Sequence, residues 1–210
     1  MVVRHVAPST VRRLSLYLQF LDQCEREGKA TVSSRALAER GGATPAQVRK
    51  DLSFFGSFGK RGIGYPTSLL ATRLRDILGL GRRHRVILVG AGRIGAALAN
   101  YPGFEARGFE IAAIYDADPS KVGVTLDGTA VRHIRDLEAD LAAHPADIAV
   151  IGTPAAAAQE VAGLLVRAGV RALLNFAPVT LAAPPEVTVT NVNMALELEA
   201  LSFALTRRRA

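Results

Sequence analysis

The sequence predicts an α/β protein made of an N-terminal winged helix-turn-helix and a C-terminal Rossmann domain with a doubly wound parallel sheet. Three observations lead to this fold class: a length of 210 residues, an uneven distribution of charge, and a glycine motif directly after an apolar strand. A chain of this length accommodates two domains, since single cores serve about 100–200 residues. We expect domains over residues 1–80 and 81–192 and a C-terminal helix over 193–210.

The composition is that of an ordinary globular protein. Hydrophobic residues make up 49% of the chain and charged residues 21%, and no apolar run approaches the roughly 20 residues of a membrane-spanning helix. The residues after Arg4 do not resemble a secretory signal, and the single cysteine, Cys24, excludes an internal disulfide. We therefore expect a cytoplasmic protein with no membrane partner.

Positive charge is concentrated in the first part of the chain. Residues 1–85 contain 16 Lys and Arg against 6 Asp and Glu, whereas residues 86–210 contain 10 against 13. Such a basic block favours contact with a polyanion, because each neutralised phosphate releases counterions. A solvated basic surface would carry the same charge, so an assignment to nucleic acid needs a motif.

Helical spacing predicts two helices at the start of the basic block. Ser9 is expected to cap the first, which runs to about Glu25. Its packing face would consist of Val11, Leu14, Leu18, Leu21 and Cys24. Ser33 or Ser34 can cap a short second helix over Arg35–Arg40.

A glycine turn and a third helix complete a helix-turn-helix. Gly41 and Gly42 end the second helix, because glycine adopts positive φ freely. Thr44 suits an N-cap and Pro45 the first helical position of a helix over Ala46–Phe55. Its inward residues are expected to be Val48, Leu52 and Phe55.

The segment Gly56–Tyr65 is rich in glycine and has cations at its centre, as expected of a two-stranded wing. In a winged helix the recognition helix enters the major groove, where Arg49 or Lys50 could contact guanine or phosphate, and a wing arginine can reach the minor groove. The alternative is a structural hairpin beside a helical cap. The candidate DNA contacts are Thr44, Gln47, Arg49, Lys50, Ser53, Lys60, Arg61 and Gly62.

A dinucleotide fingerprint opens the second domain. It follows a helix over about Leu69–Leu78 and a buried strand over Arg85–Val89. The motif consists of Gly90, Ala91, Gly92, Arg93, Ile94 and Gly95. Its first glycine permits a tight turn, its second lets the backbone approach a pyrophosphate, and its third lets the next helix pack closely on the strand.

An acidic residue follows at the expected distance. A second apolar strand, Glu110–Tyr115, ends in Asp116, 21 positions after Gly95. A carboxylate there can bind both hydroxyls of the adenosine ribose and would repel a 2′-phosphate, so NAD(H) is preferred over NADP(H). The alternative is an aspartate in a turn with no ligand.

The remaining sequence continues the alternation of strands and helices. The expected elements are a strand over Asp147–Ile151, a helix over Ala155–Arg167, strands over Val170–Asn175 and Val187–Val192, and a helix from about Met194. Ligands of such sheets bind at the carboxyl ends of the strands. This adds Thr153, Pro154 and Asn175 to the candidate cofactor contacts, although either loop could be ordinary turn chemistry.

The sequence favours a binding protein over an enzyme. An NAD-dependent oxidoreductase, the competing class, would need an acid–base group near the nicotinamide and a substrate pocket. The chain has no Tyr-x-x-x-Lys pair, and its four histidines are scattered at positions 5, 84, 133 and 144. No cluster with metal-ligand spacing is present either, so we expect neither catalysis nor a metal.

The whole chain resembles the Rex family of redox-sensing repressors. The resemblance rests on the segments Arg13–Tyr17, Val48–Gly56, Gly59–Tyr65, Gly90–Gly95, Tyr101–Pro102, Asn175–Pro178 and Asn191–Met194. It implies a homodimer that binds an inverted-repeat operator while NADH is scarce and leaves DNA when NADH binds. It also implies that the terminal helix is exchanged between subunits.

Residue roles follow from the same resemblance. Arg49, Lys50, Lys60 and Arg61 resemble DNA contacts, Gly90–Gly95 and Asp116 the dinucleotide site, and Tyr101 and Met194 the surroundings of the nicotinamide. Two positions depart from the family pattern. Gln19 stands where an arginine is usual and Asn193 where an aspartate is usual, so an interdomain ion pair would become two amides. We expect NADH to release DNA still; a paralogue insensitive to redox state is the alternative.

Overall fold

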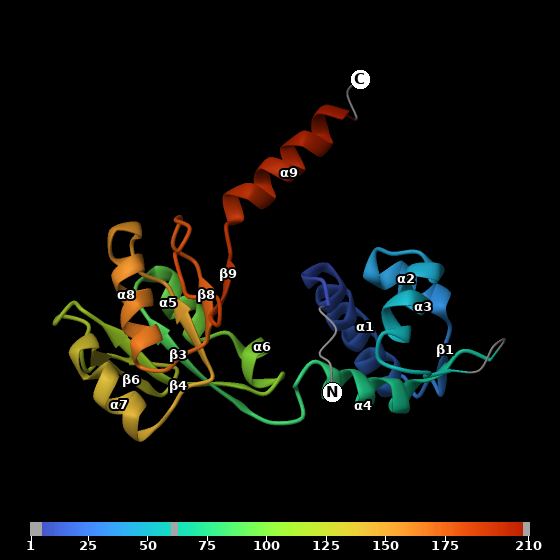
Figure 1. Cartoon of the computed structure of the whole chain (residues 1–210), viewed down its shortest axis with the longest axis horizontal. Coiled ribbons are helices and arrows are strands. Elements are labelled where there is room, and N and C mark those ends of the chain that lie inside the picture. The colour runs from blue at the N-terminus through green and yellow to red at the C-terminus, as the bar shows by residue number, and fades with distance from the viewer. Residues whose placement is uncertain (1–5, 60–62, 208–210) are drawn as a thin grey trace. The chain divides into compact units, whose positions relative to one another are not determined.

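A computed structural model describes residues 6–59 and 63–207 of the chain (Figure 1). Contacts between residues divide it into two compact units, with the division after Arg82. The first unit is helical with one small sheet, and the second is built on a seven-stranded sheet. The predicted winged helix-turn-helix and Rossmann fold are thereby confirmed, whereas exchange of the terminal helix stays a prediction.

The first unit contains four helices among the described residues. They are α1 (Pro8–Arg26), α2 (Ser34–Gly41), α3 (Pro45–Ser53) and α4 (Thr67–Ile77). The predicted caps of α2 and α3 are confirmed, since the hydroxyl of Ser33 accepts from Ala36 N and that of Thr44 from Gln47 N, each at 3.1 Å. Gly42 ends α2 with φ of +60°.

Two predictions for the first helix were wrong. The N-cap is Ala7, without a side-chain cap, because Pro8 occupies the first helical position and needs no hydrogen bond there. Val11 is 42% exposed rather than buried. The buried face instead includes Tyr17, whose ring lies against Gly41 where a Cβ would collide with it. The turn after α2 therefore requires glycine for packing as well as for backbone freedom.

The structure describes only part of the predicted wing, because residues 60–62 at its tip lie outside the described residues. The paired strands of this unit are β1 (Thr31–Val32) and β2 (Tyr65–Pro66), which run antiparallel. The described residues 56–59 contain no strand, and α3 ends at Ser53, before Phe55. The small sheet thus joins a strand before the helix-turn-helix to the end of the glycine-rich segment, and the two-stranded wing stays a prediction.

The sheet of the second unit has the strand order β5-β6-β4-β3-β7-β8-β9, with only β5 antiparallel to its neighbour. The strands are β3 (His84–Val89), β4 (Phe109–Asp116), β5 (Thr125–Leu126), β6 (Thr129–His133), β7 (Ile148–Ile151), β8 (Ala172–Asn175) and β9 (Thr188–Asn191). The predicted strands all form, within two residues of their expected bounds. Strands β5 and β6 were not predicted.

Helices cover the two faces of this sheet unequally. The helices are α5 (Arg93–Ala99), α6 (Pro102–Glu105), α7 (Leu137–Ala143), preceded by a short 3-10 turn at Ile134–Asp136, α8 (Ala155–Arg167) and α9 (Met194–Arg207). Ile87 and Val89 point into a core shared with α7 and α8, whereas Val86 and Leu88 point into a smaller core with α5. The second face is therefore only partly covered.

The terminal helix is exposed along its described length. Every side chain described from residue 194 to residue 206 is exposed, including the four leucines Leu196, Leu198, Leu201 and Leu205 and one phenylalanine, Phe203. Among the residues described here, no helix is both long and apolar enough to cross a membrane. An apolar helix of this kind needs covering surface from elsewhere.

Candidate functional site

The glycine loop lies between the carboxyl ends of β3, β4 and β7. Gly90 has φ of +104°, donates to Tyr115 O at 2.8 Å, and would bring an added Cβ to 2.7 Å from the carbonyl of Gly152. A Cβ on Gly95 would collide with the carbonyl of Gly90, so α5 can approach the loop only with glycine there. Both glycines are thus required by packing within the unit.

Gly92 differs from these two glycines. Its φ of −77° is open to any residue, and an added Cβ would meet no heavy atom within 4 Å. The fold itself therefore does not require glycine here. A ligand that approaches the backbone closely needs open space of this kind, which a side chain would fill.

Asp116 is held rigidly beside this loop at the end of β4. Its Oδ2 accepts from Ala91 N at 2.7 Å and from Lys121 Nζ at 3.1 Å, and its Oδ1 accepts from Asp118 N at 2.8 Å. Burial opposes ionisation, but these hydrogen bonds outweigh it and hold the pKa of Asp116 below its usual value. The group is therefore a fixed carboxylate with acceptor capacity left for hydroxyl groups.

Thr153 supplies an orphaned polar atom next to the loop. Its Oγ1 is buried and has no hydrogen-bond partner, and its backbone N would lie 2.9 Å from a Cβ on Gly90. Leaving a buried hydroxyl unpaired costs about 1–3 kcal/mol, so such an atom indicates a place where a ligand or a water molecule forms the hydrogen bond. The neighbouring Pro154 is the exposed N-cap of α8.

Asn175 has a structural role at the end of β8. It is 0% exposed, and its Nδ2 donates to the carbonyls of Val179 (2.8 Å) and Ala177 (3.2 Å) and to Asn191 Oδ1 (2.9 Å). Its Oδ1 accepts from Ala177 N at 2.9 Å. These bonds engage both ends of the amide, so the side chain shapes the loop after β8, and contact of Asn175 with a cofactor stays a prediction.

Asn175→Ala is expected to lower the free energy of unfolding by about 2–4 kcal/mol, because it leaves several buried backbone groups without partners. Denaturant unfolding of the whole chain measures this. Asn100→Ala is the matched control, since the exposed Asn100 makes one local bond to Ala96 O, at 2.7 Å. Equal losses in the two variants would contradict the role assigned to Asn175.

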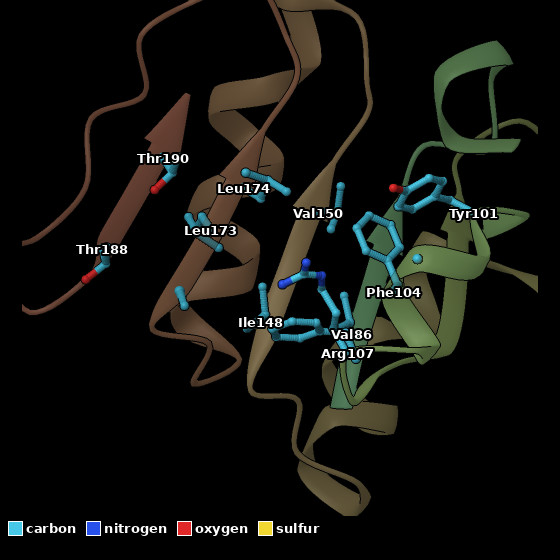
Figure 2. A pocket seen from close by; sticks show the side chains of 13 residues that line it. Val86, Tyr101, Phe104, Arg107, Ile148, Val150, Leu173, Leu174, Thr188 and Thr190 are labelled. Atoms are coloured by element: carbon cyan, nitrogen blue, oxygen red, sulfur yellow. The ribbon is translucent and has the colours of Figure 1, made fainter. Parts of the chain in front are cut away.

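Tyr101 lines an apolar cavity (Figure 2). The cavity has a volume of about 440 Å³ and lies on the partly covered face of the sheet. Its walls are the side of β3, β7, β8 and β9 that carries Val86, Ile148, Val150, Leu174, Thr188 and Thr190. The ring of Tyr101 is 56% exposed and packs edge-on against Phe104, with ring centres 5.1 Å apart. Met194, at the start of α9, is also exposed, so a nicotinamide role for this pair stays a prediction.

The candidate DNA contacts that the structure describes all lie on or beside α3. Arg49 and Lys50 are exposed, and Arg49 donates to the hydroxyl of Ser34 on α2 at 3.2 Å. The hydroxyl of Ser53 donates to Lys50 O at 2.7 Å. Lys60, Arg61 and Gly62 lie outside the described residues. Exposed cations on the second helix of a helix-turn-helix are the arrangement that reads a major groove.

Sequence reasoning missed Asp51, a fully buried carboxylate on α3. Arg13 and Tyr17 from α1 and Gln47 from α3 all donate to it. The signal was available, because Asp51 stands three positions after the buried Val48 and shares the inner face of the helix. An acidic residue in that position needs a buried cation.

Gln19 and Asn193 belong to different units. Gln19 is exposed on α1. Asn193 precedes α9, and its Oδ1 accepts from Ala195 N at 3.0 Å, as in a helix N-cap. An aspartate would cap equally well, so capping does not explain the amide. Among the described residues, no group of three or more His, Cys, Asp or Glu is placed to hold a metal ion.

Two family models match the chain. The model described as a putative DNA-binding protein N-terminus matches residues 5–53, and the model described as a CoA binding domain matches residues 82–179. The first match contains the described helices α1, α2 and α3. The second contains the glycine loop and the strands around it.

Curated relatives match nearly the whole chain. A protein of Desulfitobacterium hafniense is 46% identical over 205 residues, 98% of each chain. A protein of Thermus thermophilus is 45% identical over 200 residues, 95% of this chain and 94% of the relative. Both are named redox-sensing transcriptional repressor Rex.

Solved structures of a Rex-family repressor match as well. Its complex with β-NADH is 34% identical, has a TM-score of 0.89, and is matched over 98% of this chain and 97% of that one. Its complex with β-NAD⁺ and operator DNA is 35% identical, with a TM-score of 0.92 over 98% and 95% of the two chains.

Proposed function

Since this chain belongs to the Rex family of redox-sensing transcriptional repressors, we propose that it binds operator DNA when NADH is scarce relative to NAD⁺ and leaves it when NADH binds. The family consists of regulators, so the oxidoreductase alternative is dropped. We also propose that the chain acts in the cytoplasm, as a homodimer on an inverted-repeat operator.

The orphaned hydroxyl of Thr153, whose backbone lies against Gly90 of the glycine loop, is the observation that carries the proposal. A buried donor without a partner and a glycine that the fold does not require both fit a polar ligand at this place. The carboxylate of Asp116 lies at the adjoining strand end. Together these features fit NAD(H) bound across the carboxyl ends of the strands.

Each part of the cofactor has a proposed partner. The backbone of Gly90–Gly95 meets the pyrophosphate, Asp116 accepts from the ribose hydroxyls, and Arg93 and Thr153 provide further donors. The remaining proposed contacts are Ala91, Ile94, Tyr101, Pro154, Asn175 and Met194. The bound dinucleotide supplies the signal through the oxidation state of its nicotinamide ring.

The proposed DNA interface consists of α3 and the wing. Arg49 and Lys50 are exposed on α3 and available to guanine edges or phosphates, with Ser53 beside them. Thr44 and Gln47 begin the helix, and Lys60, Arg61 and Gly62 form the proposed tip of the wing. Phosphate contacts of this kind would make the affinity fall steeply with salt.

The exposure and two-sided pattern of α9 support the homodimer. Successive residues of a helix are about 100° apart, which places Leu196 and Phe203 opposite the other large apolar residues of α9. Those residues are Met194, Leu198, Leu201 and Leu205. Each of these six side chains is 57–66% exposed in the single chain. A helix that is apolar on two opposite sides fits between two covering surfaces, and we propose that a second copy provides them.

Fluorescence anisotropy with a labelled duplex tests the proposed function. The duplex is selected from a randomised pool by the purified protein, and the complex is titrated separately with NADH, NAD⁺ and NADPH. Release by NADH at concentrations where NAD⁺ and NADPH leave the complex intact is the expected result. If none of the three dinucleotides releases the duplex, the chain is a redox-insensitive paralogue. Light scattering of the free protein measures whether it is dimeric.

Gln19→Arg combined with Asn193→Asp is expected to shift the NADH concentration for half-maximal release by about two- to fivefold, since an exposed interdomain ion pair favours one arrangement by about 0.5–1 kcal/mol over two amides. Anisotropy at fixed protein and DNA concentration measures the midpoint. The single variants are the controls, because each creates one charge without its partner. An unchanged midpoint in the double variant would remove these two positions from the switch.

A further inference from the structure

A buried ion-pair cluster joins the recognition helix α3 to α1. Asp51 is 0% exposed, and Arg13 binds it with two bonds of 2.7 Å, from Nε to Oδ2 and from Nη2 to Oδ1. The hydroxyl of Tyr17 donates to Oδ2 at 3.1 Å, and Gln47 Nε2 donates to Oδ1 at 2.7 Å. Four donors from two helices therefore converge on one carboxylate.

The cluster stays charged across the neutral range. Burial raises the pKa of Asp51, but the hydrogen bonds from Arg13, Gln47 and Tyr17 outweigh burial and keep that pKa below its usual value. Burial and the bond to Asp51 raise the pKa of Tyr17 to about 12. Arg13 is further bound to the Thr10 hydroxyl at 3.0 Å. Asp51 is thus ionised and Tyr17 protonated at neutral pH, as the printed hydrogen bonds require.

Such a cluster fixes a register that apolar packing leaves loose. Val48 and Leu52, the other buried residues of α3, make contacts without direction, and apolar surfaces tolerate small rotations and shifts. A guanidinium fork on a carboxylate permits one orientation. A buried ion pair adds little net stability compared with apolar residues of equal volume, so its contribution here lies in the arrangement it enforces.

We propose that Asp51 is a positioning residue for DNA reading, which fixes the rotation of α3 against α1 so that the exposed cations of α3 meet the bases in register. The inference rests on the proposed function and adds a residue that never touches DNA. It also adds a role for Gln47. Its Nε2 donates to Asp51, so Gln47 belongs to the positioning cluster as well as to the proposed DNA interface at the start of α3.

Asp51→Asn and the paired replacement Arg13→Met with Asp51→Leu separate positioning from stability. Removing one partner leaves a buried charge unpaired and should lower Tm, whereas replacing both should recover part of Tm, because the buried Tyr17 hydroxyl still loses its acceptor. Affinity is measured by anisotropy for the selected duplex and for a scrambled duplex of equal length, below the Tm of every variant. Asp22→Asn is the matched control, because it removes a 2.6 Å ion pair between Asp22 of α1 and Arg75 of α4 without touching α3.

Both Asp51 variants are expected to bind the selected duplex about tenfold more weakly while binding the scrambled duplex within about twofold of the parent chain, since misplaced base contacts cost discrimination and phosphate contacts persist. Asp22→Asn should lower Tm and leave the ratio of the two affinities unchanged. If the ratio of the affinities for the selected and the scrambled duplex rises together with Tm in the paired variant, Asp51 only stabilises the fold. That result would overturn the proposal.

Two further results keep the test decisive. Arg13→Lys keeps the charge but loses the fork, and it replaces Asp51→Asn if that variant does not fold; an unchanged affinity ratio in Arg13→Lys would also overturn the proposal. A parent chain that does not distinguish the selected from the scrambled duplex would contradict the proposed function itself, independently of Asp51.

Discussion

Gly92→Val is expected to abolish release by NADH while leaving operator binding intact, which would produce a permanent repressor. The added side chain has room in the folded unit, since a Cβ at this position meets nothing within 4 Å and φ is −77°. It would occupy the space through which the pyrophosphate must approach the backbone. We expect the affinity for NADH to fall by at least about 100-fold, as for a ligand phosphate that loses its backbone contacts.

The stability of Gly92→Val separates this result from a folding defect. The free energy of unfolding should change by no more than about 1 kcal/mol, which is the typical effect of replacing a glycine at an N-cap. Gly95→Ala provides the contrast, because its Cβ would collide with the carbonyl of Gly90 and should destabilise the unit with or without cofactor. Calorimetry gives Tm and titration gives NADH affinity for both variants. Normal NADH binding by Gly92→Val would place the pyrophosphate elsewhere.

Gly163→Val serves as the matched control for a new valine in the same unit. Gly163 lies on α8, and the only atom within 4 Å of its added Cβ, outside the backbone of α8, would be Nη1 at the end of the Arg167 side chain, at 3.5 Å. NADH release should be preserved in this variant. A parallel loss of release in both variants would show that the effect is not specific to the glycine loop.

The glycine loop was predictable because each of its constraints is local. Gly90 and Gly95 are required by contacts within a few residues of the motif, with the neighbouring strand end as the only addition. Strands β5 and β6 carry no such signal. They are two and five residues long, and β6 acquires its position by pairing with β4 and β5, so propensity alone could not place them.

The small sheet and the partner of Asp51 were missed for a related reason. The partner of β2 is a two-residue strand before α2, and no local pattern connects residues that far apart. The spacing of Asp51 from Val48 indicated its place on the inner face of α3, but it could not identify Arg13, which lies 38 positions earlier on α1, as its partner. Buried charges and short strands depend on long-range pairing, which spacing within a single element does not encode.

The terminal helix gives the second large prediction. Leu198→Glu combined with Leu201→Glu is expected to make the chain monomeric and to weaken operator binding by at least about 100-fold, because two linked half-site contacts become one. In the single chain both leucines are more than 60% exposed, so charges there remove no contact within either unit. Each large apolar side chain contributes about 1.5–3 kcal/mol when an interface buries it. Dimer formation would lose that contribution and bury two unpaired carboxylates as well.

Light scattering and anisotropy on the same samples connect the two effects. Ser202→Glu is the matched control, since Ser202 lies on the polar strip of α9 between its two apolar sides, and this variant should stay dimeric with parental affinity. The Tm of a monomeric variant should approach that of the parent chain at dilutions where the parent also dissociates. A dimeric Leu198→Glu, Leu201→Glu variant would show that α9 lies outside the subunit interface. Loss of DNA binding without loss of the dimer would instead show that α9 positions the DNA-binding unit. The two outcomes can be told apart because dimer formation and DNA affinity are measured separately.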